Sequence, residues 1–188
     1  MDKQEDLKNI IATYKGVILD FDGTIVDLGV DWEELKKDLS KYCLDNKSIA
    51  VNFTQLDSQL LKMKNRYGEK FYFDLMDIIE KYELDEENYK INFDLLDIIN
   101  SLKETRVAIY SMNTMASVNN FIKKYFRTAP EIIISKENSI EPKPTDKDIL
   151  SILKKWNLYK NEVIFIGNSD YDLNSGMRAN IKTVILSI

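Results

Sequence analysis

The chain has 188 residues, of which 44% are hydrophobic and 30% charged, and it carries a formal net charge of −5. This composition is typical of a soluble globular protein, and the lack of a basic patch near either end argues against duplex nucleic acid as a partner. No apolar run is long enough to span a bilayer and the charged N-terminus lacks the apolar core of a secretory signal, so we expect a cytoplasmic protein with no membrane partner.

The residue types that are scarce exclude several kinds of chemistry. The chain contains no histidine, which rules out Ser-His-Asp catalysis, Cys-His catalysis and histidine-based metal sites. The single cysteine, Cys43, has no partner for an internal disulfide. A chain that cannot form an internal disulfide agrees with a reducing compartment.

Helical and strand patterns alternate from the N-terminus. An amphipathic helix is expected around Leu7, Ile10, Ile11 and Tyr14, followed by a short buried strand at residues 17–19. Helical periodicity then continues to about residue 91. The apolar positions on these helical faces are Trp32, Leu35, Leu39 and Tyr42, then Phe53, Leu56 and Leu60, then Phe71, Leu75, Ile78 and Ile79.

The second half of the chain alternates more regularly. Helices are expected around residues 93–102, 115–125 and 149–156, and strands at 106–111, 131–135, 162–167 and 182–187. Strands separated by helices predict an α/β fold with a doubly wound parallel sheet. We expect residues 1–28 and 92–188 to form this core and residues 29–91 to form a helical domain inserted after the first strand.

Two carboxylates, Asp20 and Asp22, follow the first strand and precede Gly23 and Thr24. Where the strand ends, both acids can converge in the crevice in which open α/β sheets bind ligands. Crowded acids repel each other unless a cation or a shared proton relieves them. The alternative is an ordinary acidic turn, since Asp-Gly is common in turns.

Three later segments also place polar groups at strand ends. Ser111 and Asn113 could donate hydrogen bonds to an anion, and Lys143 is flanked by prolines that restrict its backbone. The last of these three, which is the fourth polar segment of the chain, carries Asp170 and Asp172 shortly after a glycine. Each alone is also explained by a turn, an exposed loop lysine or an acidic helix N-terminus.

In this order, the four segments resemble the haloacid dehalogenase superfamily, and in particular its capped phosphatases of the phosphoglycolate phosphatase and β-phosphoglucomutase type. The resemblance runs from Gly16 to Ile188, and the Asp-Phe-Asp-Gly-Thr segment carries its most specific motif. It implies a Rossmann-like core with an inserted α-helical cap. The family's usual helix-Gly-Ile ending is matched with Asn180 in place of the glycine, so we expect Asn180 to form a left-handed helix cap.

The resemblance also implies roles for the site residues. Asp20 would be the nucleophile and Asp22 the general acid and base. Thr24, Ser111, Asn113 and Lys143 would order the first loop and bind the phosphoryl group. Mg²⁺ would lie between Asp20, Asp22 and the fourth loop, whose candidate ligands are Asn168, Asp170 and Asp172.

One departure concerns the metal. The family usually has an acid directly after the glycine of the fourth loop, where this chain has Asn168. The amide oxygen can still bind a hard cation, but one negative charge is lost, unless Asp170 or Asp172 compensates. We therefore expect a weaker metal site.

The resulting hypothesis is a Mg²⁺-dependent phosphomonoester hydrolase that acts on a small phosphorylated metabolite through an aspartyl-phosphate, as a monomer or weak dimer. A phosphomutase and a non-catalytic phosphate-binding protein are the alternatives. Asp22 disfavours a carbon–halogen hydrolase. A basic cluster in the insertion (Lys62, Lys64, Arg66 and Lys70) could recognise an anionic substrate tail, although a solvated helix face explains it better.

Overall fold

The computed structural model describes residues 3–186 and divides into two compact units. The first unit contains Met1–Asp27 and Tyr89–Ile188, and the second contains Leu28–Asn88. Among the described residues, no helix combines the length and the apolar character that crossing a membrane requires.

The first unit is built on a five-stranded parallel sheet with the strand order β5-β4-β1-β6-β7. The parallel α/β sheet predicted from the sequence is therefore confirmed. Its strands are β1 (Gly16–Leu19), β4 (Arg106–Tyr110), β5 (Ile132–Ile134), β6 (Val163–Gly167) and β7 (Lys182–Ile185). The predicted final strand extended to Ser187, which lies outside the described residues.

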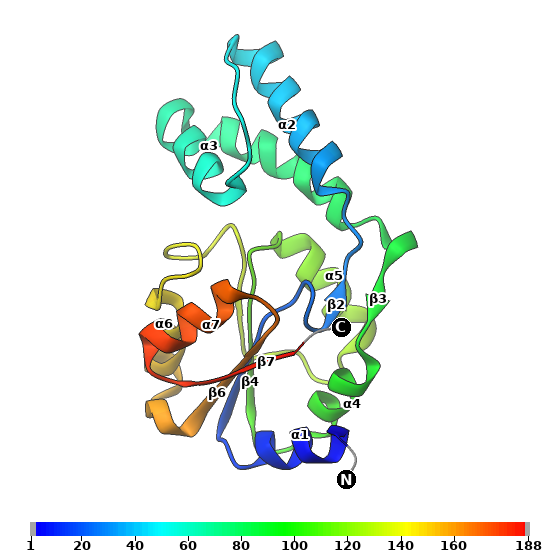
Figure 1. Cartoon of the computed structure of the whole chain (residues 1–188), viewed down its shortest axis with the longest axis vertical. Helices are drawn as coiled ribbons and strands as arrows, with labels where there is room; N and C mark the ends of the chain where they lie inside the picture. The colour runs from blue at the N-terminus through cyan, green and yellow to red at the C-terminus, as the bar shows by residue number, and fades with distance from the viewer. Residues whose placement is uncertain (1–2, 187–188) are drawn as a thin grey trace. The chain divides into compact units, whose positions relative to one another are not determined.

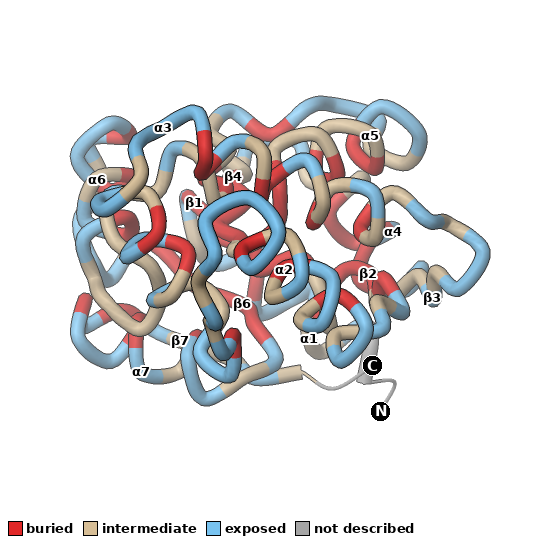
Figure 2. Tube along the Cα trace, turned by 90° about the horizontal axis from the view of Figure 1, so that it is seen from above, coloured by how far each residue is buried: buried red, intermediate tan, exposed pale blue. Residues whose placement is uncertain are grey.

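Helices cover both faces of this sheet (Figure 1). One face carries α1 (Lys3–Ala12), α4 (Phe93–Ser101) and α5 (Met115–Tyr125), and the other carries α6 (Lys147–Trp156) and α7 (Asp170–Ala179). The strands β1 and β6 are buried at every residue, because both of their faces lie under helices. Figure 2 colours the buried residues red, and red segments lie around the labels of β4 and β6. A short 3₁₀ helix, η2 (Lys160–Glu162), precedes β6.

The second unit contains α2 (Trp32–Lys47), α3 (Leu56–Glu83) and the 3₁₀ helix η1 (Glu86–Asn88). Its own apolar core includes Leu35, Phe53 and Leu75. Phe53 was expected on a helix but precedes α3, and it is nevertheless buried. The helical geometry of α3 is interrupted at Gly68, whose φ of 86° and ψ of 174° only glycine adopts readily.

A two-stranded antiparallel sheet, which the sequence patterns did not predict, lies where the chain leaves and re-enters the first unit. It pairs β2 (Val26–Asp27) with β3 (Lys90–Ile91). Asn92 follows β3, and its main-chain N–H donates to the Ile25 carbonyl while its amide donates to the Thr24 carbonyl. Two-residue strands are too short to produce a periodic signal, which explains why pattern reasoning missed them.

Most predicted elements agree with the structure to within a few residues. The first helix ends at Ala12, so Tyr14 lies beyond it, and the third predicted strand is shorter at both ends than expected. Asn180 caps α7 with φ of 56° and ψ of 47°, which confirms the predicted left-handed cap.

Candidate active site

The four polar segments meet at the carboxyl edge of the sheet because β1 lies between β4 and β6. Leu19 pairs with Ile109 on one side and with Ile166 on the other, so the residues that follow these three strands are neighbours. The main-chain N–H of Asp20 donates to the Ile166 carbonyl at 2.8 Å. From β1 the chain continues to β4 and β5 on one side of the sheet and then to β6 and β7 on the other side. Open α/β sheets bind ligands at the position where the strand order reverses in this way.

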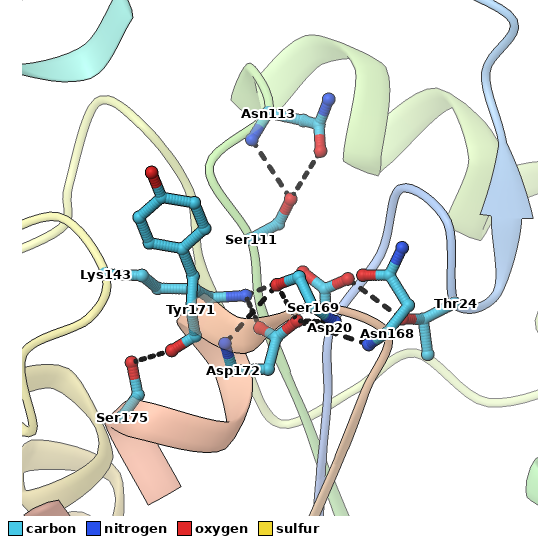
Figure 3. Close-up of polar contacts among 10 residues, drawn as sticks. All are labelled: Asp20, Thr24, Ser111, Asn113, Lys143, Asn168, Ser169, Tyr171, Asp172 and Ser175. Carbon is cyan, nitrogen blue, oxygen red and sulfur yellow. Dashed lines mark hydrogen bonds and ion pairs between the residues drawn. The ribbon is translucent and has the colours of Figure 1, made fainter. Parts of the chain in front are cut away.

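The centre of the site is a buried ion network. The Lys143 ammonium donates to Asp20 Oδ1 and to Asp172 Oδ1, each at 2.6 Å (Figure 3). The side chains of Asp20, Lys143 and Asp172 are only 9%, 4% and 1% exposed. This burial strengthens the attraction between the charges, and it makes the loss of Lys143, which contacts both carboxylates, costly.

The second oxygen of Asp172 is held by the N-terminus of α7. It accepts hydrogen bonds from the main-chain N–H groups of Asn168 and Ser169, at 3.2 and 3.0 Å, and from the Ser169 hydroxyl at 2.6 Å. Ser169 and Asp172 form a capping box at the start of this helix. Gly167 leaves the space for this arrangement, because a Cβ there would lie 2.4 Å from the Cβ of Asp172. Sequence reasoning missed Ser169, although the Ser-x-x-Asp spacing was visible.

The loop that carries Lys143 has a separate anchor. The buried carboxylate of Asp148, at the start of α6, accepts the Ser139 hydroxyl at 2.5 Å and the main-chain N–H of Ile140 at 3.0 Å. Asp148 was not identified from the sequence. Acidic residues are common in the first turn of a helix because the helix dipole favours negative charge there, so no sequence pattern distinguishes Asp148 from them.

The electrostatics of the network follow from burial and from the single cation. Burial raises the pKa of Asp20, against the attraction of Lys143. Burial also opposes ionisation of Asp172, but Lys143 and the Ser169 hydrogen bonds outweigh it and hold the pKa of Asp172 below its usual value. For Lys143, burial opposes the charge, but the two carboxylates outweigh it and raise the pKa. Lys143 therefore remains an ammonium.

The first loop turns sharply after β1 and bonds back to it. The Thr24 hydroxyl donates to Asp20 Oδ2 at 2.9 Å, so both oxygens of Asp20 have a donor. Gly23 has a φ of 80°, and its N–H donates to the Val26 carbonyl at 2.7 Å. Asp22 lies in this loop and is half-buried.

Gly23 also leaves room for Asn168. A Cβ on Gly23 would lie 1.9 Å from the Nδ2 atom of Asn168. We expect Gly23→Ala to lower both the melting temperature and the hydrolytic activity, because the left-handed backbone costs roughly 1–3 kcal/mol in a non-glycine residue and the methyl group displaces Asn168.

Gly68→Ala is the matched control for this substitution. Gly68 has a similar φ of 86° and belongs to the second unit, but no contact within 4 Å of its added Cβ is found among the described residues beyond its chain neighbours. Thermal unfolding and phosphate-release assays should show a lower melting temperature in both variants and a marked activity loss only in Gly23→Ala. Equal activity in the two variants would mean that the position of Asn168 is unimportant.

Ser111 and Asn113 follow β4 on the other side of Asp20. The buried Ser111 hydroxyl donates to Asn113 Oδ1 at 2.7 Å and accepts the main-chain N–H of Asn113 at 3.0 Å. The adjacent N-terminus of α5 is bonded to Glu137, whose carboxylate accepts the Met115 N–H at 2.9 Å. Glu137 follows β5 and gave no sequence signal.

The predicted metal ligands differ in their surroundings. Asn168 and Asp170 are exposed, whereas both oxygens of the buried Asp172 already accept hydrogen bonds. Within residues 3–186, no group of three or more carboxylate or cysteine side chains is placed to hold a metal ion. Figure 3 shows the Asn168 side chain beside the Asp20 carboxylate. Oxygen donors from these two residues suit Mg²⁺, which keeps several waters when it has few protein ligands.

The sequence model of the haloacid dehalogenase-like hydrolases matches residues 17–186, nearly the whole chain. The chain therefore belongs to this family of hydrolases, as the resemblance of its strand-end motifs predicted. Among curated proteins, none matches the sequence significantly.

Solved structures share the fold at low sequence identity. A predicted phosphoglycolate phosphatase from Haemophilus somnus has a TM-score of 0.61 and 15% identity, over 92% of this chain and 85% of its own. CbbY from Rhodobacter sphaeroides, in complex with phosphate, has a TM-score of 0.62 and 13% identity, over 93% and 87%. A hydrolase from Streptococcus pneumoniae has a TM-score of 0.52 and 21% identity, over 93% and 94%.

Proposed function

We propose that the chain is a Mg²⁺-dependent phosphatase that hydrolyses a small phosphorylated metabolite through an aspartyl-phosphate on Asp20. The observation that carries this proposal is the buried Asp20 carboxylate, held by Lys143 on one oxygen and by Thr24 on the other. A fixed carboxylate beside an ammonium suits attack on phosphorus, because the ammonium offsets the charge of the incoming phosphoryl group. Family membership and the phosphatase-like relatives support the same reaction class.

In the first half of the reaction, a carboxylate oxygen of Asp20 forms a bond to phosphorus and the bond from phosphorus to the substrate oxygen breaks. Asp22 gives its proton to that leaving oxygen. In the second half, Asp22 takes a proton from water, the water oxygen attacks phosphorus, and the bond to Asp20 breaks. Inorganic phosphate leaves, Asp20 is again a carboxylate, and Asp22 is again protonated.

The phosphoryl oxygens need donors throughout this cycle. Lys143 would supply an ammonium, and Ser111 and Asn113 would supply hydrogen bonds from the neighbouring strand end. The side chains of Ser111 and Asn113 are hydrogen-bonded to each other in this structure, so the substrate would replace that hydrogen bond. Asp172 would orient Lys143 rather than touch the substrate, because its oxygens face Lys143 and the start of α7.

Mg²⁺ would be held by Asp20, by the main-chain carbonyl of Asp22 and by the amide oxygen of Asn168. An exposed acid, Asp170, follows Asn168 by two residues. Bound there, the cation would neutralise charge on the phosphoryl group. With the neutral Asn168 in place of an acid, the site should bind Mg²⁺ more weakly than a site with a second carboxylate.

We expect Asn168→Asp to lower the Mg²⁺ concentration for half-maximal activity by about fivefold, because one added charge close to the cation contributes on the order of 1 kcal/mol. Mg²⁺ titrations of activity and of melting temperature would measure the change. Asn161→Asp is the matched control, since Asn161 is exposed and precedes β6 instead of following it. An unchanged Mg²⁺ requirement in Asn168→Asp would remove Asn168 from the ligand set, and Asp170→Asn should then raise the requirement.

Phosphate release measured across phosphorylated sugars, nucleotides and phosphoglycolate, with and without Mg²⁺, would test the function. A substrate that releases free phosphate only with Mg²⁺ is the expected result. Isomerisation of a sugar phosphate without release of phosphate would identify a phosphomutase instead. Binding of phosphate without turnover of any substrate would identify a non-catalytic protein.

We also propose that the unit formed by residues 28–88 is the cap that selects the substrate. Its α-helical composition and its insertion directly after the first loop support this role. The Lys64 Nζ atom lies 3.8 Å from Glu69 Oε1, and the Lys70 Nζ atom lies 3.3 Å from Asp74 Oδ1. Because both lysines pair with acids of their own helix, a solvated helix face explains them better than a substrate-binding cluster does.

A further inference from the structure

Lys143 packs on two aromatic rings that have no role in the reaction described above. Its ammonium nitrogen lies 4.7 Å from the centre of the Tyr110 ring and 5.4 Å from the centre of the Phe165 ring. Both rings are fully buried, and their centres are 6.1 Å apart. The face of an aromatic ring attracts a cation, and the attraction is stronger when water is excluded, as it is here.

The strand register explains why these rings lie beneath the site. Ile18 pairs with Phe165 on one side and with Ala108 on the other. Tyr110 follows Ala108 by two residues and Asp20 follows Ile18 by two, so all these side chains point to the same face of the sheet. The two rings and the Asp20 carboxylate therefore lie on the same face of the sheet, and each of them is close to the Lys143 ammonium.

We propose that Tyr110, with Phe165, is a positioning residue that keeps the Lys143 ammonium in place while the charge of Asp20 changes during the reaction. This inference rests on the proposed function. When Asp20 bonds to phosphorus, its carboxylate becomes an acyl phosphate and its hold on Lys143 weakens. The charge distribution of the rings does not change in the cycle, so Lys143 stays directed at the phosphoryl oxygens.

The ring of Tyr110, and not its hydroxyl, carries this role. The hydroxyl is buried and has no hydrogen-bond partner among the described residues, and the Ser175 hydroxyl near it donates to the Tyr171 carbonyl instead. Burial also raises the pKa of Tyr110, so the hydroxyl does not ionise near neutral pH. Phenylalanine, which keeps the ring, should therefore replace Tyr110 with little loss of activity.

The kinetic test compares Tyr110→Leu, which removes the ring, with Tyr110→Phe, which keeps it. We expect Tyr110→Leu to lower kcat/KM for the best substrate by about fivefold to thirtyfold, from the usual strength of a buried cation–ring contact. Tyr110→Phe should recover most of that loss. Ile152→Val is the control for core packing, because Ile152 belongs to the same apolar cluster. It should lower the melting temperature without the kinetic loss.

A second readout does not depend on activity. In protein labelled with ¹³C-lysine, the ε-CH₂ resonance of Lys143, assigned with Lys143→Arg, should be shifted upfield by the two rings. The shift should shrink in Tyr110→Leu and persist in Tyr110→Phe. An active parent enzyme with the upfield resonance, but with unaltered kinetics in Tyr110→Leu, would overturn this inference alone. A parent that releases no phosphate from any substrate would overturn the proposed function and this inference together.

Discussion

Asp20→Asn is expected to lower phosphate release by at least about a thousandfold, because an amide cannot attack phosphorus and Asp22 cannot take over that position. The melting temperature should change little. Lys143 keeps its contact with Asp172, and the cluster of two carboxylates and one ammonium loses its excess negative charge. Phosphate-release assays and thermal unfolding measure the two effects.

Asp97→Asn is the matched control for this variant. Asp97 is exposed on α4 of the same unit, so the same chemical change there should leave both activity and melting temperature as in the parent. A phosphate-release rate in Asp20→Asn equal to that of the parent would exclude Asp20 as the nucleophile, and with it the proposed intermediate.

Asp22→Asn is expected to slow turnover of an alkyl phosphate by about a hundredfold to ten-thousandfold, the usual contribution of a general acid or base. The alkoxide is a poor leaving group and needs the proton. With p-nitrophenyl phosphate, whose leaving group needs little protonation, the loss in the first half of the reaction should be much smaller. Both substrates should be assayed in pre-steady state, so that formation and hydrolysis of the aspartyl-phosphate are separated.

The ratio of the two losses identifies the role of Asp22. A burst of p-nitrophenol followed by slow steady turnover would show that aspartyl-phosphate still forms and that its hydrolysis has lost its general base. Equal losses on aryl and alkyl phosphates in the burst phase would contradict the acid role and leave Asp22 as a purely structural residue of the first loop.

The placement of the motifs could be predicted because parallel strands end at one edge. Asp20 and Ser111 each follow a buried apolar strand, and the fourth loop follows another, so the pattern of strands and helices alone brings them together. The network around Lys143 was only partly foreseen. Its contact with Asp20 joins residues 123 positions apart, and the sequence offered only a family resemblance as a reason to pair them.

The contacts that orient the site residues left weaker traces in the sequence. In the sequence, Tyr110 looks like an ordinary core residue of a strand. Asp148 looks like an acid that favours the start of a helix. Ser169 is recognisable in the sequence only through the Ser-x-x-Asp spacing of a capping box. Each of these residues acts through a partner on another element, so its role depends on how the elements pack.

Local periodicity, together with the edge that parallel strands share, is enough to predict the α/β class, the succession of strands and helices and the four polar strand ends. The surroundings of the individual carboxylates, in contrast, depend on how the elements pack in three dimensions. Asp172 is buried between Lys143 and the start of α7, whereas Asp170, two residues earlier, is exposed. Two acids on the first turn of one helix look alike in sequence, and their burial differs because only one faces the sheet edge.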